Sequence, residues 1–109
     1  MQNVVFLIGR LVNDPEIKKS ENAREYATIT LAVHRPYKNA DGLYESDFIR
    51  CKLWNGIASN VNEYCHKGDL IGVKGRLQTR NYEKADEKKY VMEVVADKVT
   101  FLSSKKADE

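Results

Sequence analysis

The seven residues from Phe48 to Trp54 constrain the fold more than any other stretch of the chain, because as a β-strand they divide into two different faces. Side chains of a strand alternate between its faces, so Ile49, Cys51 and Leu53 would share an apolar side. The pattern predicts a strand with one face in a hydrophobic core and the other in solvent. The residues of the solvent face are aromatic or basic: Phe48, Arg50, Lys52 and Trp54.

Rings that alternate with cations on an exposed strand suit unpaired nucleic acid. An exposed ring can stack on any base, and a cation between two rings can meet the phosphate that joins consecutive bases. Aromatic residues also pack in ordinary buried sheets, so the rings alone do not decide between a binding face and a covered one. The cations favour the binding face, because burial would leave the charges of Arg50 and Lys52 without partners.

The composition is typical of one soluble globular domain. The chain has 109 residues, of which 42% are hydrophobic and 31% charged, which suits one hydrophobic core. The apolar run Val4–Ile8 is too short for a membrane span or a signal peptide, so we expect an intracellular, cytoplasmic protein. The net charge is only +2, so binding of a polyanion would depend on where the cations lie.

Cysteine spacing and the scattered carboxylates argue against a metal site and against catalysis. Cys51 and Cys65 form no close-spaced pair, which predicts reduced thiols rather than a disulfide framework. With His34 and His66 they could be imagined as zinc ligands, but the spacing of zinc motifs is missing. The carboxylates do not converge and there is no glycine-rich phosphate loop. We expect no metal, no cofactor and no enzymatic activity.

Runs of β-branched and aliphatic residues predict five strands, and apolar residues at helical spacing predict one short helix. Asn55 is the expected N-cap of this helix and Gly68 the glycine that ends it. The predicted strands cover residues 3–11, 26–34, 48–54, 69–79 and 90–102. The other segments are predicted as a loop or weak edge at 17–24, a hairpin tip with an Asp-Gly turn at 35–42, and a charged turn at 82–89.

Side-chain alternation assigns the two sides of the last two strands. Gly75, in the middle of the fourth strand, predicts a bulge or a sharp bend of a barrel. In the fourth strand, the residues expected to point inward are Ile71, Val73 and Leu77, and those expected outward are Lys74, Arg76 and Gln78. In the last strand, Met92, Val94 and Ala96 alternate with Val91, Glu93 and Val95. The apolar residues at helical spacing are Ile57, Ala58, Val61, Tyr64 and Cys65.

Three strands, a helix and two further strands follow one another in the order of an oligonucleotide-binding (OB) barrel. The predicted fold class is therefore all-β, a five-stranded OB-fold barrel with one short helix between strands three and four. The barrel domain would occupy residues 1–103. Residues 104–109 would form a short polar tail.

Motifs spread over the whole chain match one known family. They are Asn3–Leu11 with Asp14–Glu16, Thr28–Val33, the strand that ends at Trp54, Tyr64–Asp69, Val73–Tyr82 and Tyr90–Ala96. With these motifs the chain resembles the bacterial single-stranded DNA-binding proteins from Asn3 to Leu102. The resemblance implies sequence-independent binding and protection of single-stranded DNA during replication, recombination and repair.

The resemblance also implies which residues contact DNA. In that family four aromatic side chains typically stack on bases, and the corresponding residues here are Tyr37, Phe48, Trp54 and Tyr82. Three of them are Tyr or Phe where family members often carry Trp, which keeps a ring but reduces the stacking area. We expect phosphates along this path to be met by Arg10, Arg35, Lys38, Arg50, Lys52, Lys74, Arg76 and Arg80. Tyr44 and Tyr90 are expected to be structural or peripheral.

The partners implied by the resemblance are single-stranded DNA and further copies of the chain in a homotetramer, in the nucleoid and without a membrane. Family members usually continue into a long tail whose acidic, apolar tip recruits replication and repair proteins. Residues 103–109 are polar and have no apolar tip, so recruitment through a tail is left open.

Two other functions stay open on the residues alone. A primosome-type OB-fold module would use the barrel mainly to hold other proteins. A single-stranded RNA-binding barrel would stack bases in the same way, because stacking does not distinguish ribose from deoxyribose.

Overall fold

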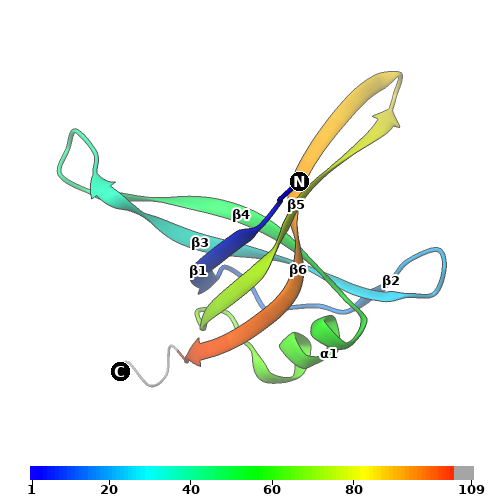
Figure 1. Cartoon of the computed structure of the whole chain (residues 1–109), viewed down its shortest axis with the longest axis horizontal. Helices are drawn as coiled ribbons and strands as arrows, with labels where there is room; N and C mark the ends of the chain where they lie inside the picture. Colours follow the sequence, from blue (N-terminus) through cyan, green and yellow to red (C-terminus); the bar gives the residue numbers. More distant parts are fainter. Residues whose placement is uncertain (105–109) are drawn as a thin grey trace.

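Five long strands close into a barrel in the computed structural model, which describes residues 1–104 (Figure 1). The sheet order is β1-β5-β6-β4-β3-β2, and a pairing of β1 with β3 closes it, with Arg10 opposite Ala32 and Leu11 opposite Leu31. The elements are β1 (Val5–Leu11), β2 (Lys18–Lys19), β3 (Glu25–Lys38), β4 (Tyr44–Trp54), α1 (Asn55–Tyr64), β5 (Leu70–Lys84) and β6 (Glu87–Ser103).

This architecture confirms the OB-fold prediction. The segment expected as a loop or weak edge forms β2, a two-residue strand that pairs with β3. Counting β2, the helix lies between β4 and β5, and among the long strands it lies between the third and the fourth. The predicted polar tail falls outside the described residues except for Ser104. Within residues 1–104, no helix has the length and apolar character that crossing a bilayer would need.

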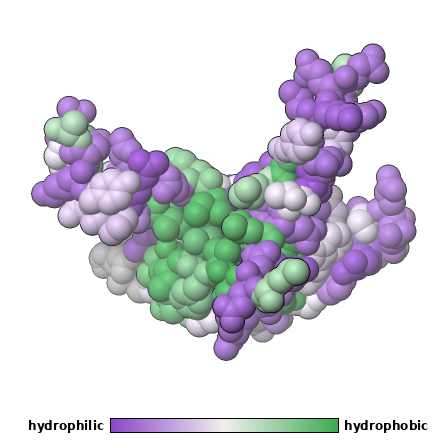
Figure 2. All heavy atoms as spheres, turned by 45° about the horizontal axis from the view of Figure 1, so that its top comes forward, coloured by the Kyte–Doolittle hydropathy of each residue, from purple (hydrophilic) through white to green (hydrophobic). Residues whose placement is uncertain are grey.

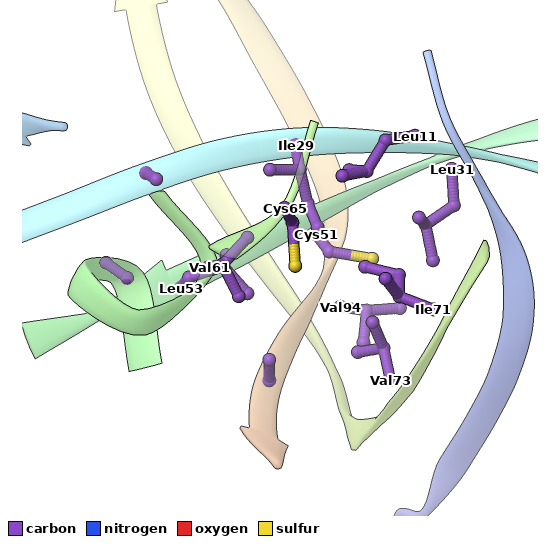
Figure 3. Packing of buried hydrophobic residues seen from close by; sticks show 13 residues of the cluster. Leu11, Ile29, Leu31, Cys51, Leu53, Val61, Cys65, Ile71, Val73 and Val94 are labelled. Carbon is purple, nitrogen blue, oxygen red and sulfur yellow. The ribbon is translucent and has the colours of Figure 1, made fainter. Parts of the chain in front are cut away.

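The barrel interior is filled by alternate residues of the strands (Figure 3). Cys51 and Leu53 of β4 are fully buried, and Ile49 packs against the same cluster from a half-buried position, as the alternation predicted. The largest fully buried side chains are Ile29, Leu31, Leu53, Ile71, Val73, Val94 and Cys51. Burial of one face of each strand fixes its register, because a slip by one residue would turn the apolar side outward.

The helix α1 packs Ala58 and Val61 into this core. Tyr64, which the sequence placed in the same apolar row, is 65% exposed and does not belong to the core. Asn55 is not the N-cap, because Trp54 takes that position with extended backbone and no side-chain cap, while Asn55 has a positive φ of 51°. Gly68 does not end the helix either. The C-cap is Cys65, and Gly68 lies in the following turn, where its N–H donates to the Leu11 carbonyl.

The β3–β4 hairpin extends beyond the barrel as an arm (Figure 1). We expected β3 to stop before Arg35, but it continues to Lys38 through a register irregularity between His34 and Lys38. Pro36 fits there because the irregularity does not require its missing N–H. The tip forms the predicted turn, with Gly42 at φ 77°.

The β5–β6 hairpin forms a second arm, where a charged turn was predicted at 82–89. The turn itself is confined to Ala85 and Asp86, both with positive φ, and the strands pair up to Lys84 and Glu87. Met92 lies on this arm and is 64% exposed, and Leu77, at its base, is 43% exposed. Leu77 was expected to point inward. Alternation continues along the strands after the barrel core has ended, so the apolar side no longer faces a core.

Gly75 lies at the predicted bulge. The β5–β6 register shifts there, with Lys74 opposite Lys98 but Gly75 opposite Ala96. A Cβ atom on Gly75 would collide with the Val95 carbonyl oxygen, so only glycine allows this close approach. On β6 both alternating rows are buried here: Glu93 and Val95 are 3% and 6% exposed, and Val94 and Ala96 are 1% and 6% exposed.

Candidate nucleic-acid interface

The outer face of β4 carries the predicted row of rings and cations, and small side chains of β3 lie beside its cations. Phe48 is 67% exposed, Arg50 is exposed, and Lys52 and Trp54 are half-buried. The register pairs Arg50 with Thr30 and Lys52 with Thr28. The predicted sorting of this strand into an apolar and an aromatic-basic face is therefore confirmed.

Trp54 lies in a cluster of aromatic and basic side chains on the outer surface. Its ring centroid is 5.4 Å from that of Tyr26, with the two rings tilted by 45°. The Arg24 guanidinium carbon lies 4.4 Å from the centroid of the indole, and the Lys52 ammonium lies 5.0 Å from it and 4.5 Å from the Tyr26 ring. These distances fall within the range of cation–π contacts. The indole is thus part of a charged surface cluster and not of the barrel core.

Four strands meet around this cluster and enclose a depression of about 490 Å³. Cations from β2, β4 and β5 line it, together with the two rings and the turn between β2 and β3. Its main basic and aromatic residues are Lys19, Arg24, Tyr26, Lys52, Trp54 and Arg80. The structure therefore brings together Lys52, Trp54 and Arg80, which the sequence analysis had assigned to one path.

Sequence reasoning missed Arg24 and Tyr26 as possible site residues. Tyr26 precedes Thr28 by two positions, so alternation alone put it on the outer side of β3. What was missing was its pairing with Trp54 across the β3–β4 ladder. Arg24 reaches the indole from the end of the β2–β3 turn, which the sequence pattern did not define.

Arg80 approaches the depression from β5 and is partly neutralised by a buried carboxylate. Its Nε lies 3.4 Å from Oε1 of Glu93, whose side chain is 3% exposed. The Arg80 guanidinium carbon is also 5.9 Å from the centroid of the Tyr82 ring, and Tyr82 is 43% exposed. Arg80 thereby links the Trp54 cluster to the base of the β5–β6 arm.

The β3–β4 arm carries Tyr37, which is 61% exposed, next to a cation that is already paired. Arg35 donates hydrogen bonds to Asp47 and Glu45, with N–O distances of 2.9 Å and 2.8 Å in the two ion pairs. The hydrogen bond from Arg35 lowers the pKa of Asp47 below its ordinary value of 3.8, and the same bond raises the pKa of Arg35. Lys38 lies 5.7 Å from the ring of Tyr44.

Three of the predicted phosphate contacts that do not line the depression lie on β1 and β5. Arg10 on β1 donates to the Gly68 carbonyl at 2.9 Å. Arg76 on β5 pairs with Asp97 at 3.1 Å. Lys74, also on β5, is exposed and lies in register with Phe6 of β1.

A second surface feature is apolar and lies on the body of the molecule between the polar arms (Figure 2). Strand β1 contributes Phe6 and Ile8, which are 64% and 49% exposed, and Val4 precedes the strand with 69% exposure. The aromatic ring of Phe6 and the side chain of Leu102 both approach Gly72. Within residues 1–104, β1 pairs along its length with β5 but with β3 only at Arg10 and Leu11, so residues 5–8 form a free strand edge.

The zinc alternative finds no geometric support in the described part of the chain. Cys51 and Cys65 are both buried free thiols, and burial raises the pKa of Cys51 to about 12 and also raises the pKa of Cys65. Among residues 1–104, no three His, Cys, Asp or Glu side chains form a group that could hold a metal ion.

Comparison with known proteins yields one family and close relatives. The model of the single-strand binding protein family matches residues 2–102. The chain is 52% identical over 106 residues to single-stranded DNA-binding protein 3 of Listeria innocua, of which it covers 66%. It is 52% identical over 103 residues to the single-stranded DNA-binding protein of Bacillus cereus, covering 61%, and 46% identical over 106 residues to single-stranded DNA-binding protein B of Bacillus subtilis, covering 94%. The first two relatives are thus considerably longer than the chain.

Proposed function

The chain belongs to the single-strand binding protein family, and we propose that it binds single-stranded DNA without regard to sequence. Bases would stack on exposed rings, and cations between the rings would meet the phosphates. The observation that carries the proposal is the cluster of Trp54, Tyr26 and Lys52 on an outer face flanked by Arg50 and Arg80. The close relatives named as single-stranded DNA-binding proteins support the same ligand.

The proposed path of the strand runs along β4 and onto the two arms. Phe48 and Trp54 would stack bases on the barrel, Tyr37 on the β3–β4 arm and Tyr82 on the β5–β6 arm. Arg50 and Lys52 are the central phosphate contacts, because they lie beside the exposed rings of the barrel face. Arg80 lines the depression as well, and it would meet a phosphate with the part of its guanidinium that does not contact Glu93. Arg10, Arg35, Lys38, Lys74 and Arg76 would add positive potential further from that centre.

The protein acts in this proposal as a binding protein and not as an enzyme. It would coat and protect single-stranded DNA during replication, recombination and repair in the bacterial cytoplasm, associated with the nucleoid. Recruitment of other proteins through a tail would depend on residues beyond the described part of the chain.

A homotetramer is the assembly that we propose. Support comes from the free edge of β1 and from the exposed apolar side chains of Phe6 and Ile8 beside it, since contiguous exposed apolar patches mark interaction sites. Light scattering after gel filtration would give the mass of four chains for the unmodified protein. Ile8→Asp should lower that mass, and an unchanged tetramer in the variant would exclude this surface as the interface.

Fluorescence of the single tryptophan provides the test of DNA binding. We expect quenching of Trp54 by oligo-dT at low concentration, with an affinity that falls as salt rises. Titrations with oligo-rU and with duplex DNA of the same length are the comparisons. Equal affinity for oligo-rU would favour an RNA-binding barrel, and no response to any nucleic acid at low salt would favour a protein-interaction module.

A further inference from the structure

We propose that the depression around Trp54 is a subsite for one nucleotide, in which Tyr26 is a second stacking ring and Arg24 a displaceable cover of the indole. This inference rests on the proposed binding of single-stranded DNA. It adds two contact residues that lie outside the row on β4, and it extends the path of the strand toward the β2–β3 turn.

The position of Arg24 is the first step of the argument. Its guanidinium lies over the indole of Trp54 at 4.4 Å from the centroid, so it occupies a ring face that a base would need for stacking. Apart from this contact, the Arg24 side chain makes no hydrogen bond or ion pair with any residue in 1–104. A base that stacks on the indole therefore has to displace only a cation–π contact.

The backbone around Arg24 is held in place although its side chain is not. The Arg24 N–H donates to the Ser20 hydroxyl, and the Arg24 carbonyl accepts from the Ser20 N–H at 2.8 Å. The guanidinium can thus leave the ring while its Cα stays beside the depression. A displaced Arg24 remains within the same basic surface and can meet a phosphate, so its movement exchanges one contact for another.

Tyr26 supplies the second ring. It lies opposite Trp54 in the β3–β4 ladder, it is half-buried, and the ammonium of Lys52 lies between 4.5 Å and 5.0 Å from both ring centroids. Two rings that share one cation provide stacking surface for a base and a positive charge for its phosphate. The volume of about 490 Å³ lies within the range of small-ligand pockets, which suits a single nucleotide.

Two substitutions and two matched controls test the subsite. Tyr26→Leu removes the second ring, and Tyr64→Leu is its control, because Tyr64 is exposed at the end of α1 and does not line the depression. Arg24→Met removes the cover and its charge, and Lys67→Met removes an exposed charge from the turn after α1. All four variants are compared with the unmodified protein by circular dichroism and by titration of Trp54 fluorescence with oligo-dT at several salt concentrations.

We expect Tyr26→Leu to raise Kd by about 5- to 150-fold, the range for one stacked base, while Tyr64→Leu leaves Kd unchanged. Arg24→Met should change the fluorescence of the free protein, because the guanidinium no longer lies on the indole. It should also flatten the dependence of log affinity on log salt by about 0.7, with a smaller change of Kd at low salt than Tyr26→Leu causes. Lys67→Met should change neither quantity.

The outcomes separate this inference from the proposed function. If the unmodified protein binds oligo-dT and both site variants behave like their controls, the subsite is wrong and DNA binding stands. If the unmodified protein does not bind, the proposed function fails and the subsite fails with it. Should Tyr26→Leu not fold, Arg24→Met decides, because an unchanged salt dependence and unchanged free-state fluorescence overturn the proposal.

Discussion

The barrel face around Trp54 and the β3–β4 arm around Tyr37 carry the same kinds of residue but differ in support and in available charge. Trp54 lies on a strand whose neighbouring residue Leu53 is fully buried in the core. Tyr37 lies near the tip of an arm, beyond a register irregularity in the β3–β4 ladder. Arg35, two residues before Tyr37, is held by two carboxylates, whereas Arg50 has no ion-pair partner within residues 1–104.

The difference indicates that a ring and a cation close together in the sequence would not contribute equally to the proposed DNA binding at the two places. A side chain on a rigid strand loses little conformational freedom when a base stacks on it, while an arm has to be ordered at the same time. A guanidinium that already pairs with carboxylates must break these contacts before it can meet a phosphate. We therefore expect the barrel face to contribute more to affinity than the β3–β4 arm.

The largest expected change in DNA affinity comes from removing the rings of Trp54 and Tyr37, one at a time. Trp54→Ala should weaken oligo-dT binding by about 1–3 kcal/mol, which is roughly 5- to 150-fold in Kd, and Tyr37→Ala should weaken it by less. Since Trp54→Ala removes the fluorescent reporter, fluorescence anisotropy of a labelled oligonucleotide is the measurement. The far-UV circular dichroism of both variants should match the unmodified protein. An unfolded Trp54→Ala variant, or a larger loss for Tyr37→Ala, would contradict the comparison.

The salt dependence of binding should distinguish free cations from paired ones. Arg50→Ala and Lys52→Ala should each flatten the slope of log affinity against log salt by about 0.7, because each removes one neutralised phosphate. Arg35→Ala should change the slope by clearly less, since its charge is already balanced by Asp47 and Glu45. Equal changes for all three variants would mean that the ion pairs on the arm open whenever DNA binds.

Removal of the two carboxylates that bind Arg35 should give the β3–β4 arm a free cation, as the barrel face has with Arg50. Glu45→Gln combined with Asp47→Asn leaves the guanidinium free to meet a phosphate, so we expect a slope steeper by up to about 0.7 and tighter binding at low salt. Glu63→Gln on α1 serves as the control for a lost negative charge. Binding that is no tighter than in the control variant would show that Arg35 does not reach the DNA.

Protonation of Asp47 at low pH should weaken its ion pair with Arg35, as the double substitution does. The hydrogen bond from Arg35 keeps the pKa of Asp47 below 3.8, so the pair is intact at neutral pH. Its contribution to stability is present above the ordinary pKa of aspartate and is lost as the pH falls through the lowered value. An NMR titration of the Asp47 carboxyl carbon should therefore show a midpoint below 3.8, and a midpoint at or above 3.8 would contradict the pairing.

The smallest expected effect concerns the second arm. Ala85 and Asp86 both adopt positive φ, which disfavours side chains other than Gly, Asn and Asp. Ala85→Asn with Asp86→Gly should stabilise the β5–β6 arm by about 1 kcal/mol, because Asn-Gly suits this two-residue turn. Slower hydrogen exchange of the arm amides, with unchanged exchange of the buried Leu53 amide, is the expected result. Unchanged exchange in the arm would mean that the turn does not limit its opening.

The sequence predicted which β4 side chains are buried, because in a barrel strand every second side chain points into the core. The alternation of Ile49, Cys51 and Leu53 against Phe48, Arg50, Lys52 and Trp54 holds in the structure, since burial of one face leaves only one register for the strand. The same rule failed for Leu77, because β5 continues beyond the core, where neither face is buried. It also did not anticipate the burial of Glu93 beneath Arg80.

The amino-acid sequence alone determined the order of strands and helix, the closed all-β class and the chemistry of the β4 surface. These features depend on local alternation, on turn residues and on Gly75, where a side chain would meet the backbone of β6. Only the tertiary structure decided which cations are free and which rings meet. The pairing of Tyr26 with Trp54, the reach of Arg24 over the indole and the capture of Arg35 by Asp47 join separate segments of the chain. Such contacts depend on the spatial approach of strands, which no local pattern specifies.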